Sequence, residues 1–309
     1  MKTYSVIIHE VGPRDGLQME KTTVPTETKI RWIEQLIASG VDIIQIGSFV
    51  HPKYVPQMAD TDELFRYFSQ PGKKPEKVTL SGLVLNEKGF ERGMACGVDM
   101  FCMGVSASET HSMKNTRMST DEALTRILAI ARLAREAGKQ VQLSVQSAFG
   151  CGYEGPIAKE KVMKIVRRYI DEGFTYISLA DTAGHADPEQ VRDLFESVGA
   201  LSDRLELTAH FHNTYGMAIA NCYAAVSAGV QTLEGSFAGL GGCPFTSVAG
   251  GNVCTEDLVH MLQRMGRRKD IRLEALIETA REAASFFQRE LPGMIYKIGS
   301  IDQQFKKEA

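Results

Sequence analysis

Short apolar runs rich in β-branched residues alternate along the chain with longer segments whose apolar positions recur every three to four residues. The short runs predict strands and the longer segments predict amphipathic helices. Strands are predicted at residues 6–9, 42–46, 78–84, 100–105, 141–145, 176–179, 206–212 and 232–237. Amphipathic helices between them are predicted at residues 26–39, 120–137, 159–172, 188–198 and 217–228.

This alternation favours a closed (β/α)8 barrel, or TIM barrel, over an open doubly wound sheet, because eight such repeats fill roughly 250 residues. No Gly-x-Gly-x-x-Gly motif follows the first strand, which argues against a dinucleotide-binding fold. Additional C-terminal helices are predicted at residues 256–265 and 271–288. We therefore expect a barrel domain over residues 1–255 and a helical extension packed on it over residues 256–309.

Composition places the chain among ordinary globular proteins, with 309 residues, 43% hydrophobic and 24% charged. A formal net charge of -3 gives no reason to expect nucleic acid or an anionic membrane as a partner. The first residues lead almost directly into a predicted strand, so we expect no targeting peptide. The six cysteines lack the spacing of a disulfide framework. A reduced, cytoplasmic protein is the expectation.

Two histidines at the end of the seventh predicted strand are the first candidates for chemistry. Side chains alternate along a strand, so His210 and His212 point the same way, about 6.6 Å apart along the chain. Asp15 follows the first strand and Asn252 follows the eighth, and closure of the barrel makes strands seven, eight and one neighbours. These four residues therefore meet at the rim where barrel active sites are built.

One carboxylate, two imidazoles and one amide form a ligand set that suits magnesium or manganese better than zinc. The alternative is a pair of interior or surface histidines that bind no metal. A second candidate lies in the glycine-rich segment at residues 236–245, where glycines precede Cys243 and Pro244 follows it. Glycines allow such a loop to fold over a ligand and hold one thiol above it, whereas an isolated cysteine is usually a buried small hydrophobic residue.

Several motifs are distributed over nearly the whole chain. They include EVGPRDGLQ at residues 10–18, CGYEG at 151–155, the segments at 48–60, 177–182 and 210–216, and GLGGCP at 239–244. Together they resemble the motifs of the 3-hydroxy-3-methylglutaryl-CoA lyase family. The resemblance implies a metal-dependent carbon–carbon lyase barrel of the same superfamily as isopropylmalate and homocitrate synthases. It also implies an acyl-CoA substrate and a place in leucine degradation.

The resemblance assigns roles position by position. It implies that the metal ligands are Asp15, His210, His212 and Asn252. Cys243 would be the catalytic thiol, and Arg14 would stabilise the negative charge that develops on the thioester oxygen. The residues expected to contact the substrate are Arg14, Gln18, Gln45, Ser144 and Asp181. For Asp181, capping of the following helix is the structural alternative.

The chain departs from the family pattern around the substrate. Gln45 stands where the family usually has an acidic residue, and Ser144 stands where it usually has a tyrosine. Asn213 replaces an aspartate and Gly152 replaces a proline. The metal and thiol residues are intact, so the pattern fits a lyase for a related 3-hydroxyacyl-CoA as well as a weak hydroxymethylglutaryl-CoA lyase.

Two other functional classes stay open at this point. One is a condensing enzyme of the isopropylmalate synthase type, which forms the carbon–carbon bond instead of breaking it. The other is a catalytically silent barrel that binds metal and acyl-CoA. A homodimer formed through the C-terminal helices is also a possible assembly.

Overall fold

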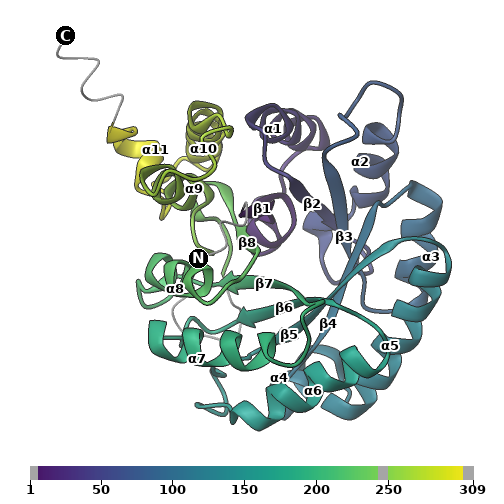
Figure 1. Ribbon diagram of the computed structural model, residues 1–309. Helices are drawn as coiled ribbons and strands as arrows, with labels where there is room; N and C mark the ends of the chain where they lie inside the picture. Colours follow the sequence, from purple (N-terminus) through teal and green to yellow (C-terminus); the bar gives the residue numbers. More distant parts are fainter. Residues whose placement is uncertain (1–5, 243–249, 302–309) are drawn as a thin grey trace.

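In the computed structural model, which describes residues 6–242 and 250–301, eight parallel strands form a closed barrel. Strand β1 pairs with both β2 and β8, which closes the sheet (Figure 1). The strands are β1 Ile7–Glu10, β2 Ile43–Ser48, β3 Thr79–Leu83, β4 Met100–Ser106, β5 Gln140–Gln146, β6 Tyr176–Asp181, β7 Glu206–Phe211 and β8 Thr232–Gly235. The predicted TIM barrel is confirmed.

Helices surround the barrel and connect successive strands. They are α1 Thr26–Ser39, α2 Thr61–Phe68, α3 Glu87–Cys96, α4 Glu109–Thr116, α5 Thr120–Glu136, α6 Lys159–Asp171, α7 Pro188–Gly199 and α8 Ala218–Ser227. Ser119 begins α5 with a reciprocal capping box to Glu122, and such a box satisfies two backbone donors at the helix start. Within the described residues, the helices are too short or too polar to cross a membrane.

The eighth strand is shorter than its apolar pattern predicts. It ends at Gly235, because the Ser236 N–H turns to donate to the Val253 carbonyl at 2.9 Å. The chain then enters the short helix η3, Phe237–Gly239, in which Ala238 has a φ of 58°. This turn directs the chain toward the glycine-rich segment at the rim.

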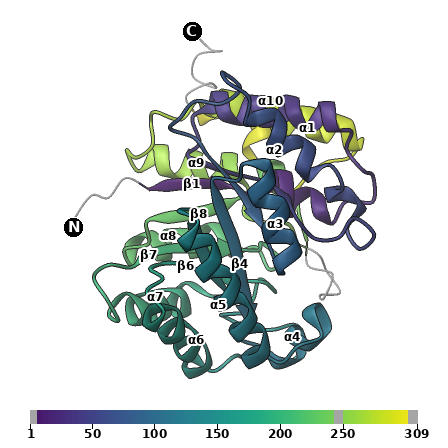
Figure 2. The same ribbon diagram turned by 90° about the vertical axis from the view of Figure 1, so that its right-hand side faces the viewer.

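The two predicted C-terminal helices are present as α9 Thr255–Arg264 and α10 Leu273–Phe287, and a short helix that was not predicted, α11 Ile295–Ile298, follows them. Figures 1 and 2 show α10 beside α1. Trp32 of α1 joins the two parts, with its ring 5.6 Å from that of Phe237 and 5.7 Å from that of Phe286. The extension therefore packs against α1 and η3. The division into two parts at residue 255 stays a prediction.

Two buried carboxylates hold η3 in place. Glu10 accepts hydrogen bonds from the N–H groups of Gly12 at 2.6 Å and Phe237 at 3.0 Å. Both carboxylate oxygens of Glu256 lie 3.1 Å from the N–H of Ala238, the residue with positive φ. Burial raises the pKa of Glu10 to about 7 and that of Glu256 to about 8. These carboxyls are therefore held largely protonated in the folded protein at mildly acidic pH.

We expect Glu256→Gln to flatten the dependence of stability on pH. Glu256 has a raised pKa in the folded state, so the folded protein retains a proton that the unfolded chain loses above about pH 4.5. This group therefore lowers stability as pH rises toward 8, and a glutamine cannot contribute to that decline. Thermal unfolding of both proteins from pH 5 to 8 measures the effect, with the exposed Glu290→Gln as the control. Parallel curves for Glu256→Gln and the parent protein would contradict it.

Candidate functional site

A cavity of about 640 Å³ lies at the rim of the barrel and draws its lining from most of the strands. Arg14 and Asp15 enter it from η1, the short turn Gly12–Gly16 that follows β1. The N–H groups of Arg14 and Asp15 donate to the Val11 carbonyl at 3.1 and 2.7 Å, which fixes the turn. A side chain at Gly12 would collide with the Phe237 ring, so glycine permits the close approach of η1 to η3.

Asp15, His210 and His212 converge in this cavity, as the sequence predicted. Their ligand atoms lie within 4.8 Å of one another. The Nε2 atoms of His210 and His212 are 3.1 Å apart. Asp15 Oδ2 lies 4.0 Å from His210 Nε2 and 3.8 Å from His212 Nε2. A divalent ion requires such an arrangement, in which nitrogen lone pairs and a carboxylate face one point.

Asn252 completes the predicted set. The Asn252 amide nitrogen donates to Asp15 Oδ2 at 2.8 Å and to the Leu240 carbonyl at 3.1 Å. Its Oδ1 is buried and has no hydrogen-bond partner among the described residues. A buried carbonyl oxygen is costly without a partner, and it is a ligand type that hard cations accept. The four residues therefore fit a divalent metal ion.

The protonation states of Asp15 and His212 favour metal binding. Burial alone would raise the pKa of Asp15, but Arg14 and the two imidazoles outweigh it and lower that pKa to about 2. Burial and the neighbouring His210 lower the pKa of His212 to about 4. Near neutral pH, Asp15 is ionised and His212 has a free lone pair, the states in which each binds a cation.

Glu234 contacts one of the candidate metal ligands, His210, and the sequence interpretation missed it. In the barrel register, Glu234 of β8 pairs with His210 of β7 on one side and with His9 of β1 on the other. Its carboxylate contacts His210 Nδ1 at 2.8 Å and His9 Nδ1 at 3.2 Å, and His9 Nε2 lies 2.9 Å from Ser81 Oγ. Holding Nδ1–H of His210 leaves its Nε2 as the free ligand atom.

We expect Glu234→Gln to weaken binding of Mn²⁺ by about 10–100-fold, because His210 loses the carboxylate that fixes its tautomer. Titration calorimetry with the ion alone measures the change. Glu206→Gln, an exposed glutamate at the start of β7, is the matched control. Equal affinity in Glu234→Gln and the parent protein would show that the carboxylate only fills space.

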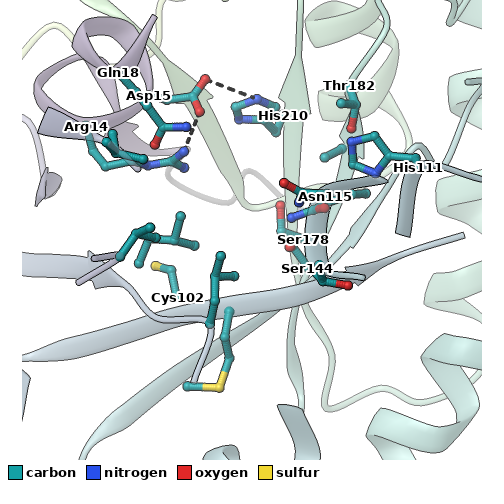
Figure 3. Close-up of a pocket in the computed structure, with 18 of the residues that line it drawn as sticks. Arg14, Asp15, Gln18, Cys102, His111, Asn115, Ser144, Ser178, Thr182 and His210 are labelled. Carbon is teal, nitrogen blue, oxygen red and sulfur yellow. Dashed lines mark hydrogen bonds and ion pairs between the residues drawn. The ribbon is translucent and has the colours of Figure 1, made fainter. Parts of the chain in front are cut away.

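Arg14 is fixed by two of its neighbours. Its Nε donates to Gln45 Oε1 and one terminal nitrogen donates to Asp15 Oδ1. Figure 3 shows Arg14, Asp15 and Gln18 on one side of the cavity, with Ser144 and Ser178 on another. The guanidinium is thus held beside the candidate metal ligands, where it can stabilise negative charge on a bound oxygen.

The remaining predicted substrate contacts divide into two groups. Gln18, Gln45 and Ser144 line the cavity. Asp181 is fully buried outside it, and its carboxylate accepts the N–H groups of His185 at 2.9 Å and Ala186 at 3.0 Å. Alternation along β6 turns Asp181 away from the cavity that Ser178 and Ala180 face. Asp181 therefore holds the loop that precedes α7, and the cap of α7 itself is Asp187, so neither the predicted substrate contact nor the predicted helix cap is seen.

Three other positions bear on the sequence interpretation. Cys243 lies outside the described residues, although its neighbour Gly242 lines the cavity. Cys102 also lines the cavity, and burial together with Glu234 raises its pKa to about 12. Asn213 accepts the Ala218 N–H at 3.1 Å and so supports the start of α8.

Comparison with known proteins places this geometry in a family. A family model described as HMGL-like matches residues 5–282. The chain belongs to this HMGL-like family. Its relatives include the hydroxymethylglutaryl-CoA lyase YngG of Bacillus subtilis, which is 38% identical over 93% of this chain and 95% of the relative. The mitochondrial hydroxymethylglutaryl-CoA lyase of Homo sapiens is 40% identical over 88% of this chain and 83% of the relative.

Solved structures of the family share the whole architecture. An HMG-CoA lyase from Acinetobacter baumannii, in complex with coenzyme A and 3-methylmalate, superposes with a TM-score of 0.90 at 36% identity. The match covers 97% of this chain and 98% of that one. The HMGL-like barrel and its C-terminal helices are therefore common to both, and this chain is an enzyme of the lyase kind.

Proposed function

We propose that this protein is a metal-dependent lyase that cleaves 3-hydroxy-3-methylglutaryl-CoA, or a closely related 3-hydroxyacyl-CoA, to acetyl-CoA and a keto acid such as acetoacetate. The observation that carries the proposal is the convergence of Asp15, His210 and His212 beside Arg14 in one cavity. The curated relatives named as lyases match this chain over most of their length, which favours cleavage over a condensing or silent barrel.

The predicted ligands Asp15, His210, His212 and Asn252 would hold magnesium or manganese. Such an ion, when bound, lowers the pKa of a substrate hydroxyl and orients it. Asp15 is the one carboxylate in this set, so a divalent ion there retains net positive charge for an anionic, oxygen-rich ligand. Glu234 keeps His210 oriented toward the same point.

The reaction requires charge stabilisation and two proton movements. The tertiary hydroxyl gives its proton to a base, either solvent or a side chain of the site. The bond between C2 and C3 breaks, C3 becomes a ketone, and the electron pair remains on C2 as an acyl-CoA enolate. Arg14 stabilises the enolate oxygen, and Asp15 and Gln45 hold its guanidinium in position. Gln45 is neutral, so it orients Arg14 without cancelling the positive charge.

The enolate must then gain a proton on C2. Cys243 is the proposed donor, because a thiol can give a proton to carbon and the family resemblance assigns this role to Cys243. An acyl-CoA as the bound partner and a place in leucine degradation are further parts of the proposal, and both follow from the family resemblance. The homodimer and the cytoplasmic location expected from the sequence are proposed as well.

The test is incubation of the purified protein with hydroxymethylglutaryl-CoA and Mg²⁺ or Mn²⁺, with acetyl-CoA and acetoacetate measured together. We expect equal amounts of both products, loss of turnover with a chelator and loss of turnover in Cys243→Ala. Release of acetyl-CoA from related thioesters, but not from hydroxymethylglutaryl-CoA, would move the proposal to another acyl chain. Absence of acetyl-CoA from every 3-hydroxy-3-alkylglutaryl-CoA would refute it.

A further inference from the structure

One wall of the cavity consists of polar side chains that the steps above do not use. Strand β5 contributes Gln142, Ser144 and Gln146, which alternate toward the cavity, and β6 contributes Ser178. We call these four residues the polar wall. Ser144 and Ser178 are register partners on adjacent strands, so their side chains lie at the same level, on the side of the cavity away from Arg14 (Figure 3).

Ser178 shows that the polar wall has an unused hydrogen-bonding group. Its side chain is 1% exposed, and its Oγ has no hydrogen-bond partner among the described residues. A buried hydroxyl without a partner destabilises the folded protein. A bound molecule that supplied the partner would remove this cost.

The surroundings of Ser144 leave room for its hydroxyl. The register partner of Ser144 on β4 is Gly104, and a side chain there would collide with Ser144 Oγ. Tyr169 donates a hydrogen bond to the Ser144 carbonyl at 3.0 Å, which fixes β5 at this level from the helix side. Ser144 and Ser178 are therefore held at the same level of a fixed strand pair, with Ser144 Oγ in the space that glycine leaves at position 104.

We propose that the polar wall is a specificity subsite for an oxygen-bearing substituent on C3 of the acyl chain, in place of a methyl group. The inference rests on the proposed lyase function, because it concerns the substrate of the same cavity. Ser and Gln side chains offer both hydrogen-bond donors and acceptors, so they suit a hydroxyl or a carboxylate. Beside an apolar substituent, these side chains would lack hydrogen-bond partners. Sites built to hydrogen-bond a substrate oxygen reject the analogue that lacks it.

The test compares two substituents of nearly equal size. The probes are 3-hydroxy-3-(hydroxymethyl)glutaryl-CoA and 3-hydroxy-3-ethylglutaryl-CoA, with hydroxymethylglutaryl-CoA and 3-hydroxy-3-carboxyglutaryl-CoA as further arms. Every arm releases acetyl-CoA, so one assay gives kcat/KM for all. We expect the hydroxymethyl compound to exceed the ethyl compound by about tenfold, as two gained hydrogen bonds imply. The carboxy arm shows whether a hydroxyl or a carboxylate fits better.

Variants connect the preference to the polar wall. In Ser144→Ala combined with Ser178→Ala, we expect the ratio of hydroxymethyl to ethyl turnover to fall close to one. Ser39→Ala is the matched control, because Ser39 is a buried serine of α1 whose hydroxyl donates to the Leu36 carbonyl of the same helix at 2.6 Å. The control should keep the ratio of the parent protein.

The outcomes separate this inference from the proposed function. Cleavage of hydroxymethylglutaryl-CoA with equal or better use of the ethyl compound overturns the subsite and leaves the function standing. If no thioester is cleaved, calorimetry of the same metal-loaded protein compares binding of the hydroxymethyl and ethyl compounds. Tighter binding of the hydroxymethyl compound then supports the subsite while the function fails, and equal binding overturns the subsite as well.

Discussion

Replacing Arg14 by glutamine is expected to lower kcat by about 10²–10³-fold with a much smaller change in KM. Negative charge accumulates on the thioester oxygen only as the carbon–carbon bond breaks, so the guanidinium contributes most in the transition state. Arg14 is fixed for this task by hydrogen bonds to Gln45 and Asp15. Steady-state release of acetyl-CoA gives the two constants separately.

Arg14→Lys separates charge from geometry. A lysine keeps the positive charge but cannot donate from two fixed positions to Gln45 and Asp15, so we expect an intermediate kcat. Arg132→Gln is the control for loss of an arginine, because Arg132 pairs with Glu172 on the outer helices. A rise in KM at unchanged kcat in Arg14→Gln would mean that this residue only binds the substrate.

Much of the barrel could be predicted from sequence because its strands are buried on both faces. Runs such as that of β4, where every residue is buried, stand out against the helical periodicity around them. The grouping of Asp15 with His210 and His212 could also be predicted from the sequence, since all three lie at strand ends and closure of the barrel brings β7, β8 and β1 together.

The supporting residues could not be predicted in the same way. Glu234 lies inside β8, and its role depends on register, which pairs it with His210 and His9 on either side. Strand register is a tertiary property, and no local pattern states which residues become neighbours. Asp181 shows the same limit, because its place at a strand end suggested the cavity while the alternation of β6 turns it toward the following loop.

Replacing Asp15 by alanine is expected to weaken Mn²⁺ binding by more than about 100-fold and to lower turnover by about 10³-fold or more, because the site loses its charged ligand. Without the carboxylate, the remaining predicted ligands are neutral, and Arg14 beside them repels a cation. Calorimetry with Mn²⁺ and acetyl-CoA release at saturating metal measure the two effects, and circular dichroism checks that the variant is folded.

Asp15→Asn distinguishes charge from shape at this position. An asparagine retains an oxygen that can accept the Asn252 amide, a hydrogen bond of 2.8 Å in the parent protein, so the local packing survives. If Asp15 acts as a metal ligand, metal affinity and turnover fall together in both variants, and excess Mn²⁺ restores part of the turnover. If turnover falls while affinity is unchanged, Asp15 acts only by positioning Arg14, and the ion must be held by His210, His212 and Asn252 without it.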